Sequence, residues 1–206
     1  MTGKPYLASE DSALLRKALG MFSGERFLEI GAGNGGNLVE ASKNFGTVMG
    51  TDLVRPSMTD WREGANFILA DCASCVRPGC VDVVAFNPPY LPGEPGEDLA
   101  VEGGGALEVP MKFLEEALRV IRKEGRAIFL LNDEAQLGGF EKICDERGFA
   151  VRRLESKRVF FEELSVYEAF VPASKLRSNT VGGSADHSQA VTSATSLRRR
   201  APASPS

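Results

Sequence analysis

The sequence contains a single histidine, His187, and four cysteines among its 206 residues. His187 lies in a C-terminal stretch of small polar residues, so we expect neither histidine-based catalysis nor a mixed His–Cys metal site elsewhere in the chain. Cys72, Cys75 and Cys80 have ligand-like spacing, but three thiols without a histidine make a poor zinc site. Cysteines this few do not form a disulfide scaffold in a chain of this length. We therefore predict reduced thiols, no bound metal and a cytosolic protein.

Long apolar runs are also lacking. No run approaches the length of a membrane span, and the first five residues do not resemble a secretory signal, so we expect no membrane partner. Positive charge is scarce over most of the chain. Residues 174–206 hold five basic residues and one acid, a net +4, which leaves −8 on residues 1–173 because the total is −4. Contacts with phosphates need Lys and Arg, so the acidic body argues against nucleic acid as the main partner.

The remaining pattern alternates strands and helices. We predict strands at 25–30, 46–51, 66–69, 81–86, 125–131, 150–157 and 165–171, and helices at 13–19, 37–43, 107–123 and 134–147. This order indicates an α/β fold: a Rossmann-like, seven-stranded, mostly parallel sheet with helices on both faces and an antiparallel C-terminal strand pair. We predict one folded domain over 1–173. Residues 174–206 are predicted to form a disordered, low-complexity basic tail, because they contain few large apolar side chains.

The most informative motif is Asn87-Pro88-Pro89-Tyr90, which directly follows the predicted apolar strand 81–86. It therefore lies at the carboxyl end of a strand, where open α/β sheets bind their ligands. An amide side chain, carbonyl groups stiffened by two prolines and an aromatic ring suit a planar nitrogen, such as that of a carboxamide or an amino-purine. A proline-rich turn without a binding role is the alternative. The residues at the other strand ends decide against that alternative.

A glycine-rich loop, 31–36, follows the first predicted strand and lets the backbone approach a ligand closely. Glu29 precedes this loop. Asp52 ends the next strand, where a carboxylate can accept both hydroxyl groups of a ribose. After the third strand, Asp71 can accept from an adenine amino group, and Cys72 can offer its backbone N–H to the adjacent ring nitrogen. These residues predict a cofactor that contains a nucleoside, and by themselves they do not separate NAD from S-adenosylmethionine.

With these motifs in this order, the chain resembles the class I S-adenosylmethionine-dependent methyltransferases, and among them the HemK-type glutamine methyltransferases of class 1 peptide-release factors. The resemblance covers about residues 5–171. Its motifs are Glu10-Asp11-Ser12, Leu28 to Gly35, Gly50-Thr51-Asp52, Ala70-Asp71-Cys72, Asn87 to Pro92 and Val101 to Gly104. Bacterial HemK proteins carry an extra N-terminal helical domain. Here the helix that begins near Glu10 leads almost at once into the first strand, so we expect the short archaeal and eukaryotic branch.

The resemblance implies a role for each motif. Residues 1–173 become a methyltransferase domain with S-adenosylmethionine as cofactor, and the implied reaction is N5-methylation of the glutamine in the Gly-Gly-Gln motif of a class 1 release factor. The implied catalytic residues are Asn87, Pro88 and Tyr90, with Asn87, Pro89 and Tyr90 at the substrate. The implied cofactor-binding residues are Ser12, Glu29, Gly31, Gly33, Asp52, Asp71, Cys72 and Asn87.

Other substrates stay open at this point. The same tetrad serves enzymes that methylate amino-purines in DNA or RNA, and a protein lysine or a nucleotide-binding module without activity are further alternatives. We favour glutamine because an acidic chain without a recognition domain suits an extruded base poorly. The resembling branch works with a small zinc-binding activator protein, so we expect such a partner. Val54, Met58 and Trp61 follow the second strand and belong either to the core or to an exposed patch for this partner.

Overall fold

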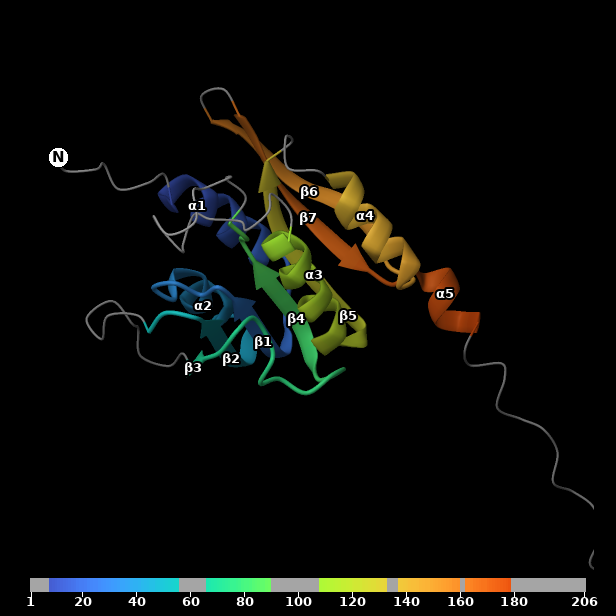
Figure 1. Cartoon of the computed structure of the whole chain (residues 1–206), viewed down its shortest axis with the longest axis horizontal. Coiled ribbons are helices and arrows are strands. Elements are labelled where there is room, and N and C mark those ends of the chain that lie inside the picture. Colours follow the sequence, from blue (N-terminus) through green and yellow to red (C-terminus); the bar gives the residue numbers. More distant parts are fainter. Residues whose placement is uncertain (1–7, 56–65, 90–107, 133–136, 160–161, 179–206) are drawn as a thin grey trace, which may run out of the picture.

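The computed structural model describes residues 8–55, 66–89, 108–132, 137–159 and 162–178. Their strands form a seven-stranded sheet in the order β3-β2-β1-β4-β5-β7-β6 (Figure 1). The strands are β1 Gly24–Ile30, β2 Phe45–Asp52, β3 Asn66–Leu69, β4 Val81–Phe86, β5 Ile121–Asn132, β6 Ala150–Val159 and β7 Glu162–Phe170. Strands β1 to β5 are parallel, whereas β7 runs antiparallel to β5 and β6. The fold class predicted from the sequence is therefore confirmed.

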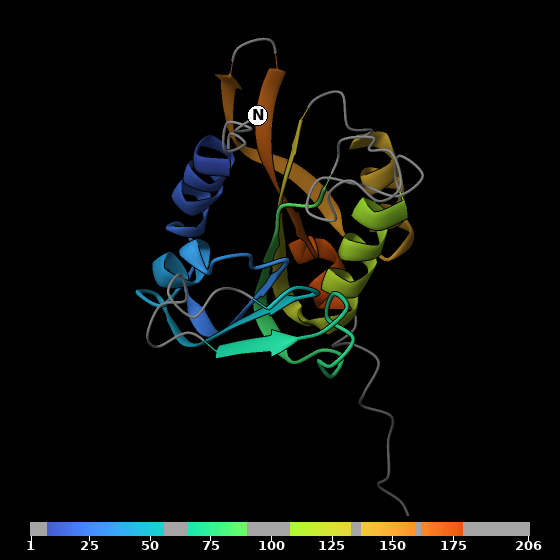
Figure 2. The ribbon, with the colours of Figure 1, turned by 60° about the vertical axis from the view of Figure 1, so that its left-hand side comes forward.

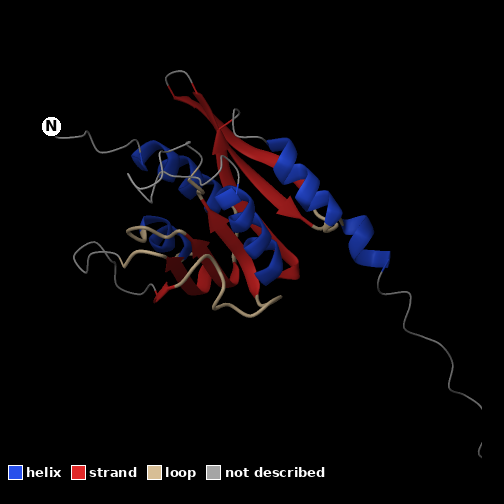
Figure 3. Ribbon diagram, viewed as in Figure 1, coloured by secondary structure: helices blue, strands red, loops and turns tan. Residues whose placement is uncertain are grey.

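Helices cover both faces of this sheet. They are α1 Ala8–Leu19, α2 Gly36–Ala41, α3 Glu108–Val120, α4 Leu137–Glu146 and α5 Ala173–Ser178. Figure 2 shows α1 and α2 on one face and α3 and α4 on the other. Figure 3 shows the antiparallel β6–β7 pair beside the parallel strands, with α5 after it. Among the described residues, no helix has both the length and the apolar character that crossing a bilayer requires.

The central strands are buried on both faces, which explains why β4 reads as an almost continuous apolar run. Beneath α3 and α4, the Phe129 ring lies 5.4 Å from the ring of Phe86 and 5.1 Å from that of Phe140, measured between centroids. Beneath α1 and α2, the fully buried side chains of Leu15 and Leu38 pack in a second cluster. These two apolar layers fix the positions of the strand ends.

Most element boundaries differ by a few residues from those predicted, most clearly in three places. Helix α1 begins at Ala8, so Glu10 and Asp11 lie in its first turn, where acidic side chains favour the helix dipole. Helix α3 ends at Val120 instead of residue 123, because Ile121 already pairs with Val81 of β4. Residues 174–178, which we assigned to the tail, belong to α5, and 179–206 lie outside the described residues. At the end of α3, strand pairing with β4 thus outweighs the local helical pattern.

Candidate functional site

The carboxyl ends of the parallel strands β1 to β4 lie side by side at one end of the sheet. Ile30 of β1 lies in register with Phe86 of β4 and with Thr51 of β2, and β3 ends at the same level as β2. The strand order reverses between β1 and β4, since β2 and β3 extend to one side and β5 to the other. Open α/β sheets bind ligands at such a switch point. The glycine-rich loop and Asn87 begin one residue beyond these strand ends, and the structure therefore brings the two motifs together.

The glycine-rich loop folds over the end of β2. The backbone N–H groups of Gly31 and Ala32 both donate to the carbonyl oxygen of Thr51, at 2.8 and 3.0 Å. Gly31 and Gly33 have φ values of 72° and 51°, in the left-handed region that glycine adopts without strain. Glycine is therefore required for the path of the backbone at the place where a ligand would approach it.

Replacing Gly31 by alanine tests this requirement. Alanine would have to adopt the left-handed φ of this position, and its added methyl group would lie 3.1 Å from Cε1 of Phe113. We expect a loss of about 1–2 kcal/mol in unfolding free energy. We also expect the loop to shift, so that binding of S-adenosylhomocysteine weakens about tenfold, which corresponds to about 1.4 kcal/mol. Thermal unfolding and titration calorimetry measure the two effects.

Gly79→Ala is the matched control for this substitution. Gly79 also has a positive φ, 66°, and an added Cβ would meet no atom within 4 Å. It lies just before the amino end of β4, at the opposite end of the strand from Asn87. We expect a similar loss of stability with unchanged binding. Equal loss of binding in both variants would mean that general destabilisation of the protein, and not a shift of the glycine-rich loop, weakens ligand binding.

Glu29 is a buried carboxylate at the end of β1, with only 3% of its surface exposed. Asn37 of α2 donates from Nδ2 to Glu29 Oε1 at 2.6 Å, while Oε2 has no hydrogen-bond partner among the described residues. Burial raises the pKa of Glu29 to about 8; the Asn37 hydrogen bond opposes the rise, nearby Asp52 adds to it, and Arg16 of α1 opposes it. A buried carboxylate lacking one donor is costly. The missing donor fits an ammonium or N–H group of a ligand.

Asp52 holds the loop and still has acceptor capacity. Its Oδ2 accepts from the backbone N–H of Gly33 at 2.9 Å, and its Oδ1 accepts from that of Val54 at 3.0 Å. The side chain is half-buried. Each carboxylate oxygen has a second lone pair, so Asp52 can accept further hydrogen bonds from hydroxyl groups. Its position at the end of β2 agrees with the predicted ribose contact, which stays a prediction.

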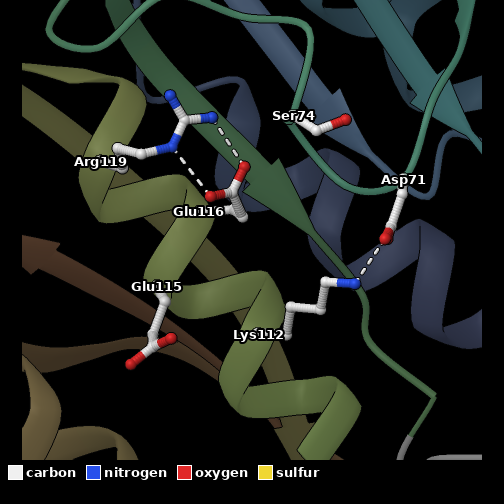
Figure 4. A pocket seen from close by; sticks show the side chains of 6 residues that line it. All are labelled: Asp71, Ser74, Lys112, Glu115, Glu116 and Arg119. Atoms are coloured by element: carbon white, nitrogen blue, oxygen red, sulfur yellow. Dashed lines mark hydrogen bonds and ion pairs between the residues drawn. The ribbon is translucent and has the colours of Figure 1, made fainter.

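Asp71 forms an ion pair that the sequence did not predict. Figure 4 shows Lys112 of α3 reaching across to Asp71, with Nζ 2.5 Å from Oδ2. The hydrogen bond from Lys112 holds the pKa of Asp71 below its usual value. Cys72 is buried and has a left-handed φ of 47°; burial, with Asp71 adding, raises its thiol pKa to about 12. A cavity of about 480 Å³ opens here, lined by Asp71, Ser74, Lys112, Glu115, Glu116 and Arg119.

The tetrad after β4 presents a buried acceptor. Oδ1 of Asn87 is inaccessible to solvent and has no hydrogen-bond partner among the described residues. Pro88 is buried and Pro89 is half-buried, whereas Tyr90 lies outside the described residues. Most buried polar atoms in folded proteins are hydrogen-bonded. An unpaired amide oxygen at the switch point is thus suited to an N–H donor from a ligand.

The remaining residues singled out from the sequence are Ser12 and the cysteines. Ser12 is half-buried on α1, beside buried Asp11. The structure records all four cysteines as free, and Cys75 is exposed, so Cys72, Cys75 and Cys80 do not converge on a metal position. In the part of the chain that the structure describes, no group of three or more His, Cys, Asp or Glu could hold a metal ion.

Three polar residues of the site were missed. Arg16, Asn37 and Lys112 are ordinary polar residues of predicted helices, and no sequence motif marks them. Their helices carry them to the strand ends: Arg16 faces Glu29 from α1, Asn37 bonds it from α2, and Lys112 bonds Asp71 from α3. Only the packing of these helices against the sheet reveals the contacts.

Comparisons with known proteins agree with this geometry. No family model matches the chain. A Methanocaldococcus jannaschii protein, named as a candidate protein N5-glutamine methyltransferase, is 30% identical over 183 residues, which cover 80% of this chain and 91% of that protein. A chain of the E. cuniculi Mtq2–Trm112 complex, described as responsible for methylation of the termination factor eRF1, matches with a TM-score of 0.69 and 26% identity over 82% of this chain and 98% of that one.

A third match shares the fold. It is the Burkholderia thailandensis 1,6-didemethyltoxoflavin-N1-methyltransferase, solved with 1,6-didemethyltoxoflavin and S-adenosylhomocysteine bound. The two chains superimpose with a TM-score of 0.53 at 17% identity, over 81% of this chain and 79% of that one. In that protein, S-adenosylhomocysteine is bound to the same fold.

Proposed function

Because this chain belongs to the class I S-adenosylmethionine-dependent methyltransferases, in the branch of the protein N5-glutamine enzymes, we propose that its substrate is the Gly-Gly-Gln glutamine of a class 1 peptide-release factor. The observation that carries the proposal is the buried, unpaired Oδ1 of Asn87 at the switch point of the sheet. A carboxamide NH2 group supplies the donor that this oxygen lacks. The E. cuniculi complex, described as methylating eRF1, supports the choice of a release factor.

The residues present fit the cofactor. When bound, S-adenosylmethionine supplies an electrophilic methyl group on a sulfonium centre. The unpaired Oε2 of buried Glu29 is suited to an ammonium group, and Asp52 retains lone pairs for ribose hydroxyl groups. Ser12, Gly31, Gly33 and the Asp71–Cys72 turn complete the proposed cofactor-binding set.

A carboxamide nitrogen is a poor nucleophile, because its lone pair is delocalised into the carbonyl group. We infer that Asn87 Oδ1 and the carbonyl oxygen of Pro88 accept the two amide hydrogens, and that Tyr90 lines the substrate slot beside Pro89. Holding both hydrogens fixes the direction of the nitrogen lone pair and contributes through proximity and orientation. The two acceptors also stabilise the positive charge that grows on nitrogen. The methylated amide then loses a proton to water, so no strong base is required.

A transfer assay tests the substrate class. The protein is incubated with its activator, with labelled S-adenosylmethionine, and either with a class 1 release factor or with single-stranded DNA and RNA. We expect label in the release factor, and none when the glutamine of its Gly-Gly-Gln motif is replaced by alanine. Label in the nucleic acid, or label that persists in the altered release factor, would overturn the proposed substrate.

The exposed edge at β3 supports a proposal about assembly. Strand β3 is the outermost strand on its side of the sheet and pairs with β2 alone among the described strands. Leu53, Val54 and Leu69 are 63%, 59% and 63% exposed beside this edge. Apolar side chains along an open strand edge suit a partner that adds to the sheet. We propose that a small zinc-binding activator protein, comparable to the Trm112 bound to Mtq2, docks here.

Leu69→Lys is expected to weaken this docking. It places a charge in the proposed apolar interface. We expect a loss of about 2 kcal/mol, the cost of losing a hot-spot residue, which is roughly thirtyfold in affinity. Met58 and Trp61, also considered for this surface, lie outside the described residues. Pull-down with the activator, followed by calorimetry, measures the loss.

Met21→Lys is the control for this prediction. Met21 is 54% exposed and lies between α1 and β1, before the amino end of a central strand, whereas Leu69 ends the outermost strand β3. It is expected to bind the activator like the wild type. If Leu69→Lys also binds normally, the activator does not dock at β3.

A further inference from the structure

Side chains of helix α3 hydrogen-bond to the turn that follows β3. Lys112, Glu116 and Arg119 lie at positions i, i+4 and i+7 of the helix and face this turn (Figure 4). The Arg119 guanidinium donates to the carbonyl oxygens of Ala73 and Val76 at 2.7 and 2.8 Å. Glu116 accepts from the same guanidinium at 2.8 and 2.7 Å and keeps it oriented. The backbone of the turn is thereby held against the helix.

The side chain at the start of the turn is held as well. Lys112 Nζ lies 2.5 Å from Asp71 Oδ2. The left-handed φ of Cys72, 47°, is uncommon for a residue with a side chain, so this turn has a strained backbone at the residue after Asp71. The ammonium group of Lys112 therefore fixes the carboxylate from α3, while the remaining lone pairs of the carboxylate stay available.

We propose that Lys112 is a positioning residue for adenine recognition: it holds the Asp71 carboxylate in the orientation in which it accepts the exocyclic amine of the cofactor's adenine. This inference rests on the proposed role of Asp71 in cofactor binding. An ionised carboxylate has acceptors only, so it favours a 6-amino purine, which donates at that position. A 6-oxo purine presents an oxygen there and is repelled.

The ion pair has little reason to exist for stability alone. The side chains of Lys112 and Asp71 are 49% and 50% exposed, and pairs this exposed contribute little to folding. A residue that only stabilised the fold would affect all ligands alike. Lys112 is instead expected to change the preference between two ligands that differ at one purine atom.

Lys112→Met tests the inference by binding measurements with S-adenosylhomocysteine and S-inosylhomocysteine, which carries a 6-oxo purine. We expect the wild type to prefer the adenosyl ligand. In the variant, affinity for the adenosyl ligand should fall about five- to tenfold, the range of a lost charge-assisted hydrogen bond, while the inosyl ligand changes little. Lys112→Arg should restore most of the preference. Lys142→Met, at an exposed position of α4, is the control and should bind both ligands like the wild type.

A pH series gives a second readout. Two groups act on the Asp71 carboxylate: the ammonium of Lys112 on α3 and the thiol of Cys72 in the same turn. Glu116 of α3 acts in turn on the Cys72 thiol. The Lys112 hydrogen bond lowers the pKa of Asp71, so binding of the adenosyl ligand by the wild type should persist to lower pH. In Lys112→Met this pKa rises, and binding should be lost at a higher pH on acidification.

The outcomes separate this inference from the proposed function, because neither ligand requires a protein substrate. An unchanged ligand preference in Lys112→Met would overturn the role of Lys112 and leave the methyltransfer proposal standing. Failure of the wild type to bind S-adenosylhomocysteine would overturn both. A release factor that stays unmethylated, with the expected loss of preference, would overturn the proposed substrate alone.

Discussion

Asn87→Ala is expected to lower kcat for methyl transfer by about a hundred- to a thousandfold, the range seen when one preorganised hydrogen-bonding group is removed from a transition state. The wild-type Oδ1 is buried, has no partner among the described residues and lies at the switch point beside the glycine-rich loop. Alanine removes the acceptor and leaves one amide hydrogen of the glutamine unheld. The lone pair of the nitrogen then loses its fixed direction. Single-turnover kinetics with saturating cofactor measure the effect.

Two further variants show whether the acceptor itself matters. Asn87→Asp keeps an acceptor oxygen at the same place and should retain more activity than alanine. Asn44→Ala removes an exposed asparagine after α2 and should behave like the wild type. S-adenosylhomocysteine should still bind to Asn87→Ala, which distinguishes a catalytic defect from loss of the cofactor. Near-normal turnover by Asn87→Ala would show that Asn87 does not hold the reacting amide.

Glu29→Gln is expected to remove a large pH dependence of stability. Burial raises the pKa of Glu29 from 4.5 to about 8 in the folded chain. Between these values the folded protein holds a proton that the unfolded chain releases. The resulting stabilisation is complete below about pH 4.5 and is lost as the pH rises through about 8. At 1.36 kcal/mol for each unit, the wild type should lose about 4–5 kcal/mol over this window, and Glu29→Gln should lose little.

The two thiol pKa values that burial raises lie above this window. The thiols of Cys72 and Cys144 have pKa values raised to about 12 by burial, so their contribution changes only at higher pH. The pKa of Asp71 is lowered and matters only in acid. Urea unfolding at several pH values gives the two curves. Parallel curves for wild type and Glu29→Gln would contradict the raised pKa.

The same carboxyl group links cofactor binding to proton release. If a ligand ammonium fills the place of the donor that Oε2 lacks, the ionised form of Glu29 is favoured in the complex. Binding near neutral pH should then release a proton, and affinity should increase as the pH approaches 8. Calorimetry in buffers of different ionisation enthalpy measures this release. In Glu29→Gln the release should disappear and affinity should fall.

Much of the fold could be read from the sequence. Strands β3 and β4 have the predicted bounds, because a clear loop signal follows each apolar run. The signal is the polar Asp71 after β3 and the Asn87 loop with its two prolines after β4. The join between α3 and β5 could not be read, since helical spacing continues through Ile121 and only its pairing with Val81 makes it a strand residue. Short-range patterns thus predict elements better than the junctions between them.

The site was predicted in part. Residues at strand ends were found because parallel strands bring their carboxyl ends together, which places Glu29, Asp52 and Asn87 at one edge. Asn37 and Lys112 were not found, because helices carry them and their contacts depend on how each helix packs on the sheet. A single sequence does not encode that packing in any local motif.

Tandem mass spectrometry of a class 1 release factor, after incubation with the protein, its activator and S-adenosylmethionine, decides whether glutamine is the substrate. We expect one added methyl group on the side-chain nitrogen of the glutamine in the Gly-Gly-Gln motif. The same reaction with Asn87→Ala should leave that glutamine unmodified. A methyl group on a lysine, or an unmodified release factor in a reaction where nucleic acid becomes methylated, would contradict the proposed function.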